Sequence, residues 1–390
     1  MTDQPEAPRP YFALTRGQEA FRANARRWVR EVVAPHAAGP DADCFPAEVI
    51  RSAADRGFMG IVAPLEYGGL GLDHVCFALF VEEVAYVCAS TAVCLDVHAS
   101  VGTEPLLLLG NDAQRARFVP DLASGRTLAA FALTESEAGS DAAALRTMAR
   151  RDGDIYVLDG AKTFISNAGQ AGLYTVLAST DRAQGSRGIS AFLVPSATPG
   201  LSAGQPMHKM GLSASITAEL VFDRCQIPVA NRLGAEGDGF KVAMRALDSG
   251  RIGISAQALG LSRAALDEVR RILAAHQLGG GHASQATQFA MADLATAMEG
   301  ARLLAFEAAR SCDAGQPFTR VASMAKLLST DTAMAVTTAA LDLVADVATS
   351  AEMGRLERYF RDAKATQLYE GTNQIQRIVI ARHALGGAPG

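Results

Sequence analysis

A carboxylate stands immediately before a predicted turn and helix in residues 368–377, where Glu370 is followed by Gly371. Glycine adopts backbone angles that other residues avoid, and Asn373 with Gln376 three residues later predicts a capping box at the helix start. This arrangement makes Glu370 a candidate general base at a rigid helix entrance. The alternative is an acidic residue that only stabilises a helix N-terminus, which is the commoner use of the pattern. The helix would turn four apolar residues toward a core: Ile375, Ile378, Val379 and Leu385.

Small and hydroxyl-bearing residues fill a second stretch, residues 132–141, which ends a predicted strand. Thr134, Ser140 and the backbone N–H groups of this stretch could hydrogen-bond an anionic or carbonyl-bearing ligand. Turns rich in Ser, Thr and Asp are also ordinary surface loops, so the stretch alone leaves both interpretations open.

The familiar motifs for dinucleotides and metals are absent from the sequence. No Gly-x-Gly-x-x-Gly segment lies between a predicted strand and a helix, which argues against a Rossmann dinucleotide site. Residues 160–163 resemble the tail of a phosphate-binding loop, but Ile155 occupies the position of its first glycine. The six cysteines are dispersed without a Cys-x-x-Cys pair or a His-Glu-x-x-His motif, so we expect free thiols and no metal.

Composition narrows the class of protein. The 390 residues are 49% hydrophobic and carry a net charge of −5, with Lys and Arg scattered along the chain. This predicts a large core in two or three domains and no binding of nucleic acid or an anionic membrane surface. Residues 1–10 are polar and Pro-rich, and we expect no apolar run long enough to span a bilayer. A cytoplasmic protein with a small-molecule partner is the resulting expectation.

Hydrophobic periodicity divides the chain into helical, β and helical parts, which is an α+β fold class. Residues 1–125 are the expected N-terminal helical domain, residues 126–235 a β-barrel or sandwich domain, and residues 236–390 a C-terminal four-helix bundle. The Asp-Gly pairs at 152–153 and 159–160 predict hairpins. Strands are expected at residues 127–134, 155–158, 163–165, 174–179, 189–194 and 219–222, and long helices at 243–273, 287–310 and 321–347.

Several segments together resemble the acyl-CoA dehydrogenase family, in the family's own helical–β–helical order and over residues 17–385. Residues 132–144 fit the family's first signature, and residues 162–167 (Lys-Thr-Phe-Ile-Ser-Asn) resemble the segment that packs on its flavin. Further similarity covers residues 220–228, 233–240 and 247–260, the last being closest to the short-chain (butyryl-CoA type) branch.

The resemblance implies a homo-oligomer, dimer or tetramer, in fatty acid metabolism, with FAD between the β domain and the C-terminal bundle. The implied reaction oxidises a short acyl-CoA to its trans-2-enoyl thioester: Glu370 abstracts the α-proton, flavin N5 accepts the β-hydride, and electrons pass to an electron-transfer flavoprotein. A weakly acidic α-proton requires a carboxylate whose pKa is raised by apolar, water-free surroundings. Some family members place the base at the position of Gly250, which is vacant here and favours Glu370.

A set of flavin contacts follows from the same resemblance. Thr134 would reach the pyrimidine edge, Ser166 would donate toward N5, and Phe164 would cover the ring. Without the resemblance, the apolar members of the set could equally be plain strand core. The other residues implied to contact FAD are Phe131, Leu133, Ser140, Gln285, Thr372 and Gln374.

A thioester site is implied beside the flavin. One implied member of this site is Arg251, but an arginine in a helix more commonly forms an ion pair with a neighbouring acidic residue. Asp96 and His98 lie where the family has the floor of its acyl pocket and could recognise a polar acyl group, although a satisfied core histidine is the commoner role of a residue such as His98. The residues implied to contact the thioester are Ser140, Arg251, Tyr369 and Gly371.

Two segments depart from the family pattern. Residues 276–280 lack the arginine that clamps the FAD pyrophosphate from the neighbouring subunit, and residues 342–348 lack the Gln and glycines of a second such element. Arg270 or Arg271 could replace the missing cation, whereas Asp346 would repel the phosphates. We therefore expect FAD to be held less firmly here than in typical relatives.

Two alternatives remain open on the sequence. One is a secondary-metabolism relative that acts on an acyl-carrier-protein thioester, either by desaturation or by a redox-neutral ring closure. The other is a non-catalytic family member that has lost FAD.

Overall fold

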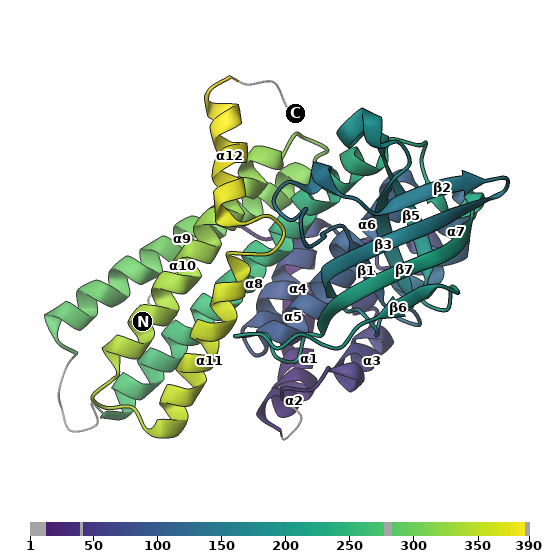
Figure 1. Ribbon diagram of the computed structural model, residues 1–390. Helices are drawn as coiled ribbons and strands as arrows, with labels where there is room; N and C mark the ends of the chain where they lie inside the picture. Colours follow the sequence, from purple (N-terminus) through teal and green to yellow (C-terminus); the bar gives the residue numbers. More distant parts are fainter. Residues whose placement is uncertain (1–12, 40–41, 277–282, 387–390) are drawn as a thin grey trace.

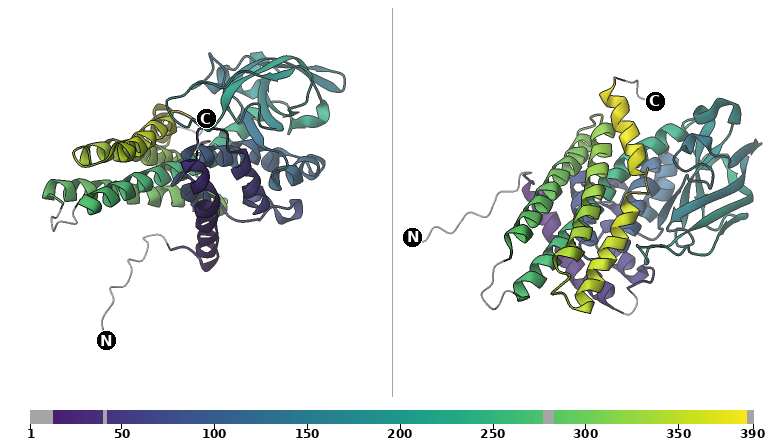
Figure 2. Two further views of the ribbon diagram at one scale, coloured as in Figure 1. Left: turned by 90° about the horizontal axis from the view of Figure 1, so that it is seen from below. Right: turned by 60° about the vertical axis from the view of Figure 1, so that its left-hand side comes forward.

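Three parts follow one another along the chain of the computed structural model, which describes residues 13–39, 42–276 and 283–386. Helices form the first part, a mixed β-sheet the second and long helices the third (Figure 1). Figure 2 shows the sheet at one side of the molecule and the long helices at the other. The expected helical–β–helical fold is confirmed, and we propose domain boundaries near residues 125 and 235, in the connections before Ala129 and before Gly239.

The N-terminal part consists of short helices whose starts are fixed by side-chain caps. Thr15 and Gln18 form a reciprocal capping box at the first helix, and Asn111 and Gln114 form another at the last. The elements are α1 (Arg16–Trp28), η1 (Val29–Val33), α2 (Ala34–Ala38), α3 (Ala47–Asp55), η2 (Phe58–Gly60), η3 (Leu65–Tyr67), α4 (His74–Ala85), α5 (Ala89–Val97), η4 (His98–Gly102), α6 (Glu104–Leu109) and α7 (Asp112–Ala123).

The central part is one mixed eight-stranded sheet with the strand order β6-β7-β3-β2-β4-β5-β8, and β1 pairs with β4 in parallel. The strands are β1 (Ala129–Ala132), β2 (Met148–Asp152), β3 (Ile155–Ser166), β4 (Leu173–Ser179), β5 (Ile189–Pro195), β6 (Leu201–Ala203), β7 (Thr217–Pro228) and β8 (Arg232–Leu233). Side chains of β3 and β7 share a core with those of β4 and β5, where the rings of Tyr156 and Phe192 lie 5.0 Å apart. The sheet therefore encloses its own core, as the predicted barrel or sandwich requires.

Only one of the two predicted hairpins is present. Asp152 pairs with Ile155, so the connection between β2 and β3 is a tight turn in which Gly153 has a φ of 57°. Gly160 instead lies inside β3, where the register against β7 shifts and a Cβ would lie 2.6 Å from Thr147 Oγ1. The prediction of a second hairpin is wrong because this glycine serves a bulge and a close backbone approach. The short or polar strands β2, β6 and β8 were not predicted.

The C-terminal part contains the helices α8 (Gly239–His276), α9 (Gln285–Asp313), α10 (Thr319–Leu343), α11 (Ser350–Thr366) and α12 (Asn373–Ala384). The first four form the expected bundle, in which α10 packs against α8, α9 and α11. Helix α8 also contacts α4 and β5, so it touches all three parts of the chain. Figure 1 shows α12 extending beyond the other helices.

Two expectations for α12 are wrong. Its N-cap is Thr372, whose hydroxyl accepts the N–H of Ile375, and not Asn373. Ile378 and Leu385 do not face a core of this chain, because they are 46% and 86% exposed. The predicted N-cap was therefore one residue too late. The apolar periodicity of the helix also overestimated the burial of Ile378 and Leu385.

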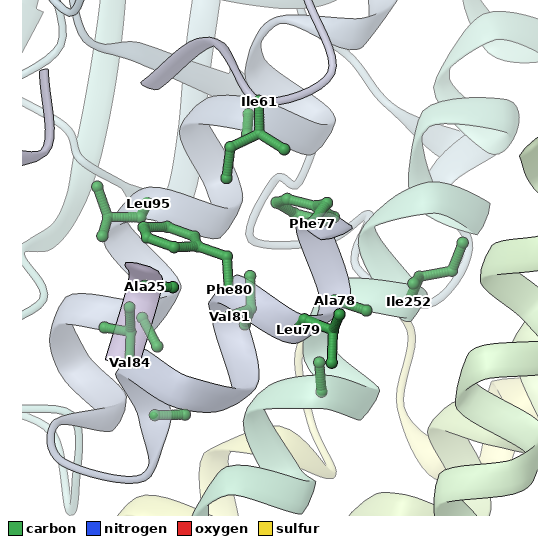
Figure 3. Packing of buried hydrophobic residues seen from close by; sticks show 14 of the residues in the cluster. Ala25, Ile61, Phe77, Ala78, Leu79, Phe80, Val81, Val84, Leu95 and Ile252 are labelled. Carbon is green, nitrogen blue, oxygen red and sulfur yellow. The ribbon is translucent and has the colours of Figure 1, made fainter. Parts of the chain in front are cut away.

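A shared apolar core joins the first and third parts. Figure 3 shows Phe77 and Phe80 of α4 in one cluster with Leu95 of α5 and Ile252 of α8. Trp28 is fully buried against Phe80, with 5.7 Å between the ring centroids. Because each Å² of buried apolar surface contributes about 25 cal/mol, this core fixes α8 firmly against the N-terminal helices.

Buried ion pairs connect the same helices. Glu82 of α4 has no exposed surface and lies 2.6 Å from both Arg302 of α9 and Arg263 of α8. The adjacent Glu83 pairs with Arg263 and with Arg22 of α1. Burial alone would raise the pKa of Glu82, but the guanidinium groups outweigh it and lower the pKa to about 2. Such pairs define the register of the packed helices more than they add net stability.

One segment, Ala89–Leu109, is long and apolar enough to cross a membrane by length and composition alone. This corrects the expectation that no such run exists. The segment spans α5, η4 and α6, and 78% of its most apolar window is buried inside the protein. Its apolar character is that of a core helix.

Candidate active site

Glu370 lies in a strained turn between α11 and α12. The φ angle is 52° at Glu370 and 88° at Gly371, so two successive residues take left-handed conformations. A residue other than glycine pays about 1–2 kcal/mol for this geometry, and such strain is concentrated at functional sites. The turn is held by Gln376 Nε2, which donates to the carbonyls of Glu370 at 3.2 Å and Gly371 at 2.8 Å.

The carboxylate of Glu370 rests directly on Gly250 of α8. A Cβ at position 250 would lie only 2.1 Å from Glu370 Oε2, so the glycine makes room for the carboxylate. Both carboxylate oxygens are buried and have no hydrogen-bond partner in the part of the chain that the structure describes. The candidate base is therefore buried against α8, and its oxygens remain available to a bound molecule.

The surroundings of Glu370 tune its proton affinity. Burial raises its pKa from the ordinary 4.5 to about 8; the cations of Arg251 and Lys326 limit the rise, and Glu104 adds to it. A carboxylate with this pKa binds a proton far more readily than an ordinary glutamate, which is what removal of a proton from weakly acidic carbon requires.

Lys326 of α10 is a site residue that the sequence analysis missed. It has no exposed surface, and its Nζ lies 2.9 Å from both the Gly371 carbonyl and Asn373 Oδ1. Burial lowers its pKa to about 7. A single Lys in an Ala-rich helix was the only available signal, because nothing local indicates that the side chain points toward the turn before α12.

Arg251 lies beside the candidate base, and its predicted contact with a thioester stays a prediction. Its Nη2 is 3.8 Å from the place that a Cβ of Gly371 would occupy, and its Nη1 pairs with Asp248 at 2.5 Å. The Nε atom is buried without a partner among the described residues. The arginine thus makes the ordinary helix ion pair and still presents one unused donor.

Tyr369 and Phe131 bring the bundle and the sheet together. Both pack on one apolar cluster, although Phe131 comes from β1 and Tyr369 from the turn before α12. The hydroxyl of Tyr369 donates to the side chain of Gln257 on α8. Leu133 is buried in the adjoining cluster, on which Phe131 also packs. These predicted residues therefore converge on the side of α8 that carries Gly250.

An aromatic ring and two unpaired hydroxyls mark the sheet's side of the site. Phe164 is 67% exposed and has a φ of 57°, so a strained backbone holds its ring out of the core. The hydroxyls of Thr134 and Ser166 make no hydrogen bond with the described residues. The N–H of Thr163 donates to the Thr134 carbonyl at 2.9 Å, which places the two segments side by side. Such a surface fits a flat ring system with a polar edge, as in the isoalloxazine of FAD.

Asn167 is a positioning residue that was quoted in the family motif but not assigned a role. It is fully buried with a φ of 62°, and its Nδ2 donates to the Cys94 carbonyl of α5 at 3.0 Å. Its N–H donates to the Ile216 carbonyl at 2.9 Å. Asn167 thereby joins the end of β3 to the N-terminal helices directly behind Phe164 and Ser166.

A buried ion pair supports the neighbouring loop. Lys162 Nζ lies 2.7 Å from Glu135 Oε1 and donates to the Leu133 carbonyl at 2.9 Å. Glu135 also accepts the N–H of Thr147 at 2.9 Å. These bonds fix the chain on both sides of Thr134, so the loop is held in one shape despite its polar sequence.

The cofactor and thioester contacts of the other predicted site residues stay predictions. Ser140 and Gln374 are exposed, and the Thr372 hydroxyl serves as the cap of α12. Gln285 begins α9 at the end of the bundle that lies far from the sheet (Figure 1). The predicted contact of Gln285 with FAD stays a prediction.

The proposed substitutes for the missing FAD clamp are exposed and already paired. Arg270 lies 2.7 Å from Asp267, and Arg271 pairs with two glutamates. The clamp segment beyond His276 lies outside the described residues, and Asp346 is exposed after α10. Weaker FAD binding therefore stays a prediction.

His98 has a structural role. It is 1% exposed, and its Nδ1 accepts the N–H of Ala129 at 2.9 Å. Burial lowers its pKa to about 4, so the ring is neutral near pH 7. The histidine joins η4 to β1, but its Nε2 is buried without a hydrogen-bond partner among the described residues, so it is only half satisfied.

Models of the three acyl-CoA dehydrogenase domains match the chain in order. The N-terminal domain matches residues 15–126, the middle domain residues 130–225 and the C-terminal domain residues 237–385. The matched ranges contain the Glu370 turn, the Thr134 loop and the Phe164 strand.

Similar proteins cover nearly the whole chain. An acyl-CoA dehydrogenase of Bacillus subtilis is 44% identical over 382 residues, which are 96% of this chain and 99% of the relative. The structure of butyryl-CoA dehydrogenase from Megasphaera elsdenii has a TM-score of 0.91 and 37% identity, covering 96% of this chain and 99% of that one. A chain from the work on the electron transferring flavoprotein of Acidaminococcus fermentans has a TM-score of 0.91 and 40% identity, with the same coverage. Three domain models in order and full-length relatives at this identity show that the chain belongs to the acyl-CoA dehydrogenase family.

Proposed function

We propose that this protein is a FAD-dependent dehydrogenase of short acyl-CoA thioesters, in which Glu370 removes the α-proton. The observation that carries the proposal is the buried carboxylate of Glu370, seated on Gly250, unpaired and with a pKa raised to about 8. No other arrangement among the described residues combines a strained backbone, an orphaned carboxylate and an adjacent surface suited to a flavin.

The chain's own residues divide the work of the reaction. The thioester binds between Glu370 and the sheet, and exclusion of water keeps the carboxylate basic. Lys326 and Gln376 hold the turn, so that the base does not have to reorganise as it accepts the proton. Arg251 can offer its unused Nε–H to the bound molecule.

The residues on the sheet's side would hold the cofactor that family members use. Phe164 would cover the flavin ring, and the hydroxyls of Thr134 and Ser166 would bond its polar edge. Phe131 and Leu133 would line it from β1. FAD, when bound there, supplies the acceptor for the hydride that leaves Cβ.

Acyl chain length provides the direct test of this function. We expect saturated acyl-CoA esters of about four carbons to be oxidised most efficiently, because overfilling a closed pocket costs more than the roughly 0.8 kcal/mol gained per buried methylene. Steady-state kcat/KM with a series of straight-chain acyl-CoA esters and electron-transfer flavoprotein as acceptor would measure this. A preference for long chains would contradict the short-chain assignment, and no turnover of any acyl thioester would contradict the function.

The pH dependence of the reaction should report the base. Only the ionised form of Glu370 can accept a proton, so kcat/KM should rise with pH and level off above an apparent pKa of about 8. Arg251→Met removes the cation that lowers the pKa of Glu370 most, so the rising limb should move to higher pH. Lys209→Met is a matched control, because Lys209 bonds the Ser215 carbonyl. An unchanged limb in Arg251→Met would contradict the coupling.

Three further features belong to the proposal. Electron-transfer flavoprotein is the partner, supported by the likeness to a chain from the work on such a protein. A homo-oligomer, dimer or tetramer, is supported by the position of Gln285 and by exposed Phe289 and Leu303 on α9. A cytoplasmic location is supported by the free thiol of every cysteine.

A further inference from the structure

A second buried carboxylate lies beside the proposed base. Asp96 of α5 has no exposed surface, and its Oδ2 has no hydrogen-bond partner among the described residues. Its Oδ1 receives only a long bond of 3.3 Å from Ser100 Oγ, whose shorter bond of 2.7 Å goes to the Asp96 backbone carbonyl. Buried polar groups in folded proteins are almost always paired, so this carboxyl calls for an explanation.

Asp96 and Glu370 occupy neighbouring places on the same face of α8. A Cβ at Gly253 would lie 1.9 Å from Asp96 Oδ1, just as a Cβ at Gly250 would lie 2.1 Å from Glu370 Oε2. Helix positions three residues apart have Cβ positions about 5–6 Å from each other. The carboxyl groups of Glu370 and Asp96 therefore lie about one turn of α8 apart, against Gly250 and Gly253 respectively.

The rest of this wall is apolar. Val93, Val97 and Val101 of α5 and η4 are buried in one cluster with Ile254 of α8. Burial raises the pKa of Asp96 well above its ordinary value, and the charge of Glu370 raises it further. The Asp96 carboxyl thus presents one buried oxygen without a partner beside an apolar cluster.

The spacing of the two glycine positions is comparable with the length of a short acyl chain. If the Cα of a bound thioester lies at Glu370, roughly two or three further chain atoms extend from Cα toward Asp96. A hydrogen bond of about 2.8 Å from the last atom then reaches the Asp96 carboxyl. An acyl group that ended in a methyl would leave Asp96 unpaired, whereas a terminal hydroxyl would satisfy it. A terminal cation near Glu370 would lower the pKa of that base and weaken it.

We propose that Asp96 is a specificity-determining residue that hydrogen-bonds a hydroxyl at the distal end of a short acyl thioester. The preferred substrate class is therefore a short ω-hydroxyacyl thioester, of which 4-hydroxybutyryl-CoA is the probe. This inference rests on the proposed function, because it assumes that Glu370 marks the reacting carbon.

The test compares isosteric thioesters. For the wild-type holoenzyme, kcat/KM for 4-hydroxybutyryl-CoA should exceed that for pentanoyl-CoA, in which a methyl replaces the hydroxyl, by roughly ten- to a hundred-fold. Asp96→Ala should abolish or reverse this ratio, and Asp96→Asn, which keeps a hydrogen-bonding oxygen, should retain most of it. Ser90→Ala is the control, because it removes another buried unpaired polar group from α5.

A binding measurement separates specificity from catalysis. In the Glu370→Gln background, calorimetric titration should show the same preference for 4-hydroxybutyryl-CoA, and the additional Asp96→Ala change should remove it. Equal affinities for the two thioesters with and without Asp96 would overturn the inference, as would a preference for 4-(trimethylammonio)butyryl-CoA, whose cation donates no hydrogen bond. If the wild type oxidises butyryl-CoA but shows no hydroxyl preference, only this inference fails; if it oxidises no thioester, the proposed function fails.

Discussion

Glu370→Gln is expected to reduce the rate of thioester-dependent flavin bleaching by roughly 10²-fold or more while the protein stays folded and yellow. Glutamine has nearly the shape of glutamate but cannot accept a proton, and general-base catalysis contributes about 10²–10⁴-fold. The carboxylate makes no hydrogen bond among the described residues, so the substitution breaks none of them. Rapid mixing of the oxidised enzyme with butyryl-CoA would measure the chemical step directly.

The same variant has a clear expectation for stability. Because the pKa of Glu370 is raised to about 8 in the fold, the stability that its carboxyl contributes is fully present below the unfolded value near 4.5 and is lost as the pH rises through 8. Glutamine does not ionise, so at pH 8 the variant should unfold at the same temperature as the wild type or a higher one. Near-normal bleaching in a stable, yellow variant would remove Glu370 from the role of base.

Gly250→Ala is expected to lower kcat by about 10²-fold without destabilising the protein. The new Cβ would lie 2.1 Å from Glu370 Oε2, and the carboxylate can move aside because it ends a flexible side chain. A displacement of about 1 Å of a catalytic group costs on the order of 10²-fold in rate. The helix itself should tolerate the change, since Ala favours a helix by about 1 kcal/mol over Gly.

A matched glycine controls this second prediction. Gly300 of α9 is also helical, and a Cβ there would meet nothing within 4 Å, so Gly300→Ala should keep full activity. Bound flavin, thermal unfolding and kcat with butyryl-CoA should be measured for both variants. Full activity of Gly250→Ala would mean that the carboxylate does not rest on Gly250 when it reacts.

Local patterns in the sequence predicted the parts that depend on neighbouring residues. The helical and β regions follow from hydrophobic period, and the turn at Glu370 follows from the glycine after it and the new helix beyond. The Asp-Gly pair at 159–160 shows the limit of such evidence. It has the same composition as the pair at 152–153, but it lies within β3 because of its pairing with β7, a strand distant in sequence.

The sequence by itself determined the order of the parts, the segments that resemble the family and the candidate base. Only the tertiary structure decided that Glu370 lies on Gly250, that Lys326 holds the turn, and that Asp96 lies one turn away at Gly253 with one oxygen unpaired. The physical reason is that burial and proximity set the pKa and hydrogen bonding of these groups. Both depend on how α5, α8 and α10 pack together, and the residues next to each group in the sequence do not indicate that packing.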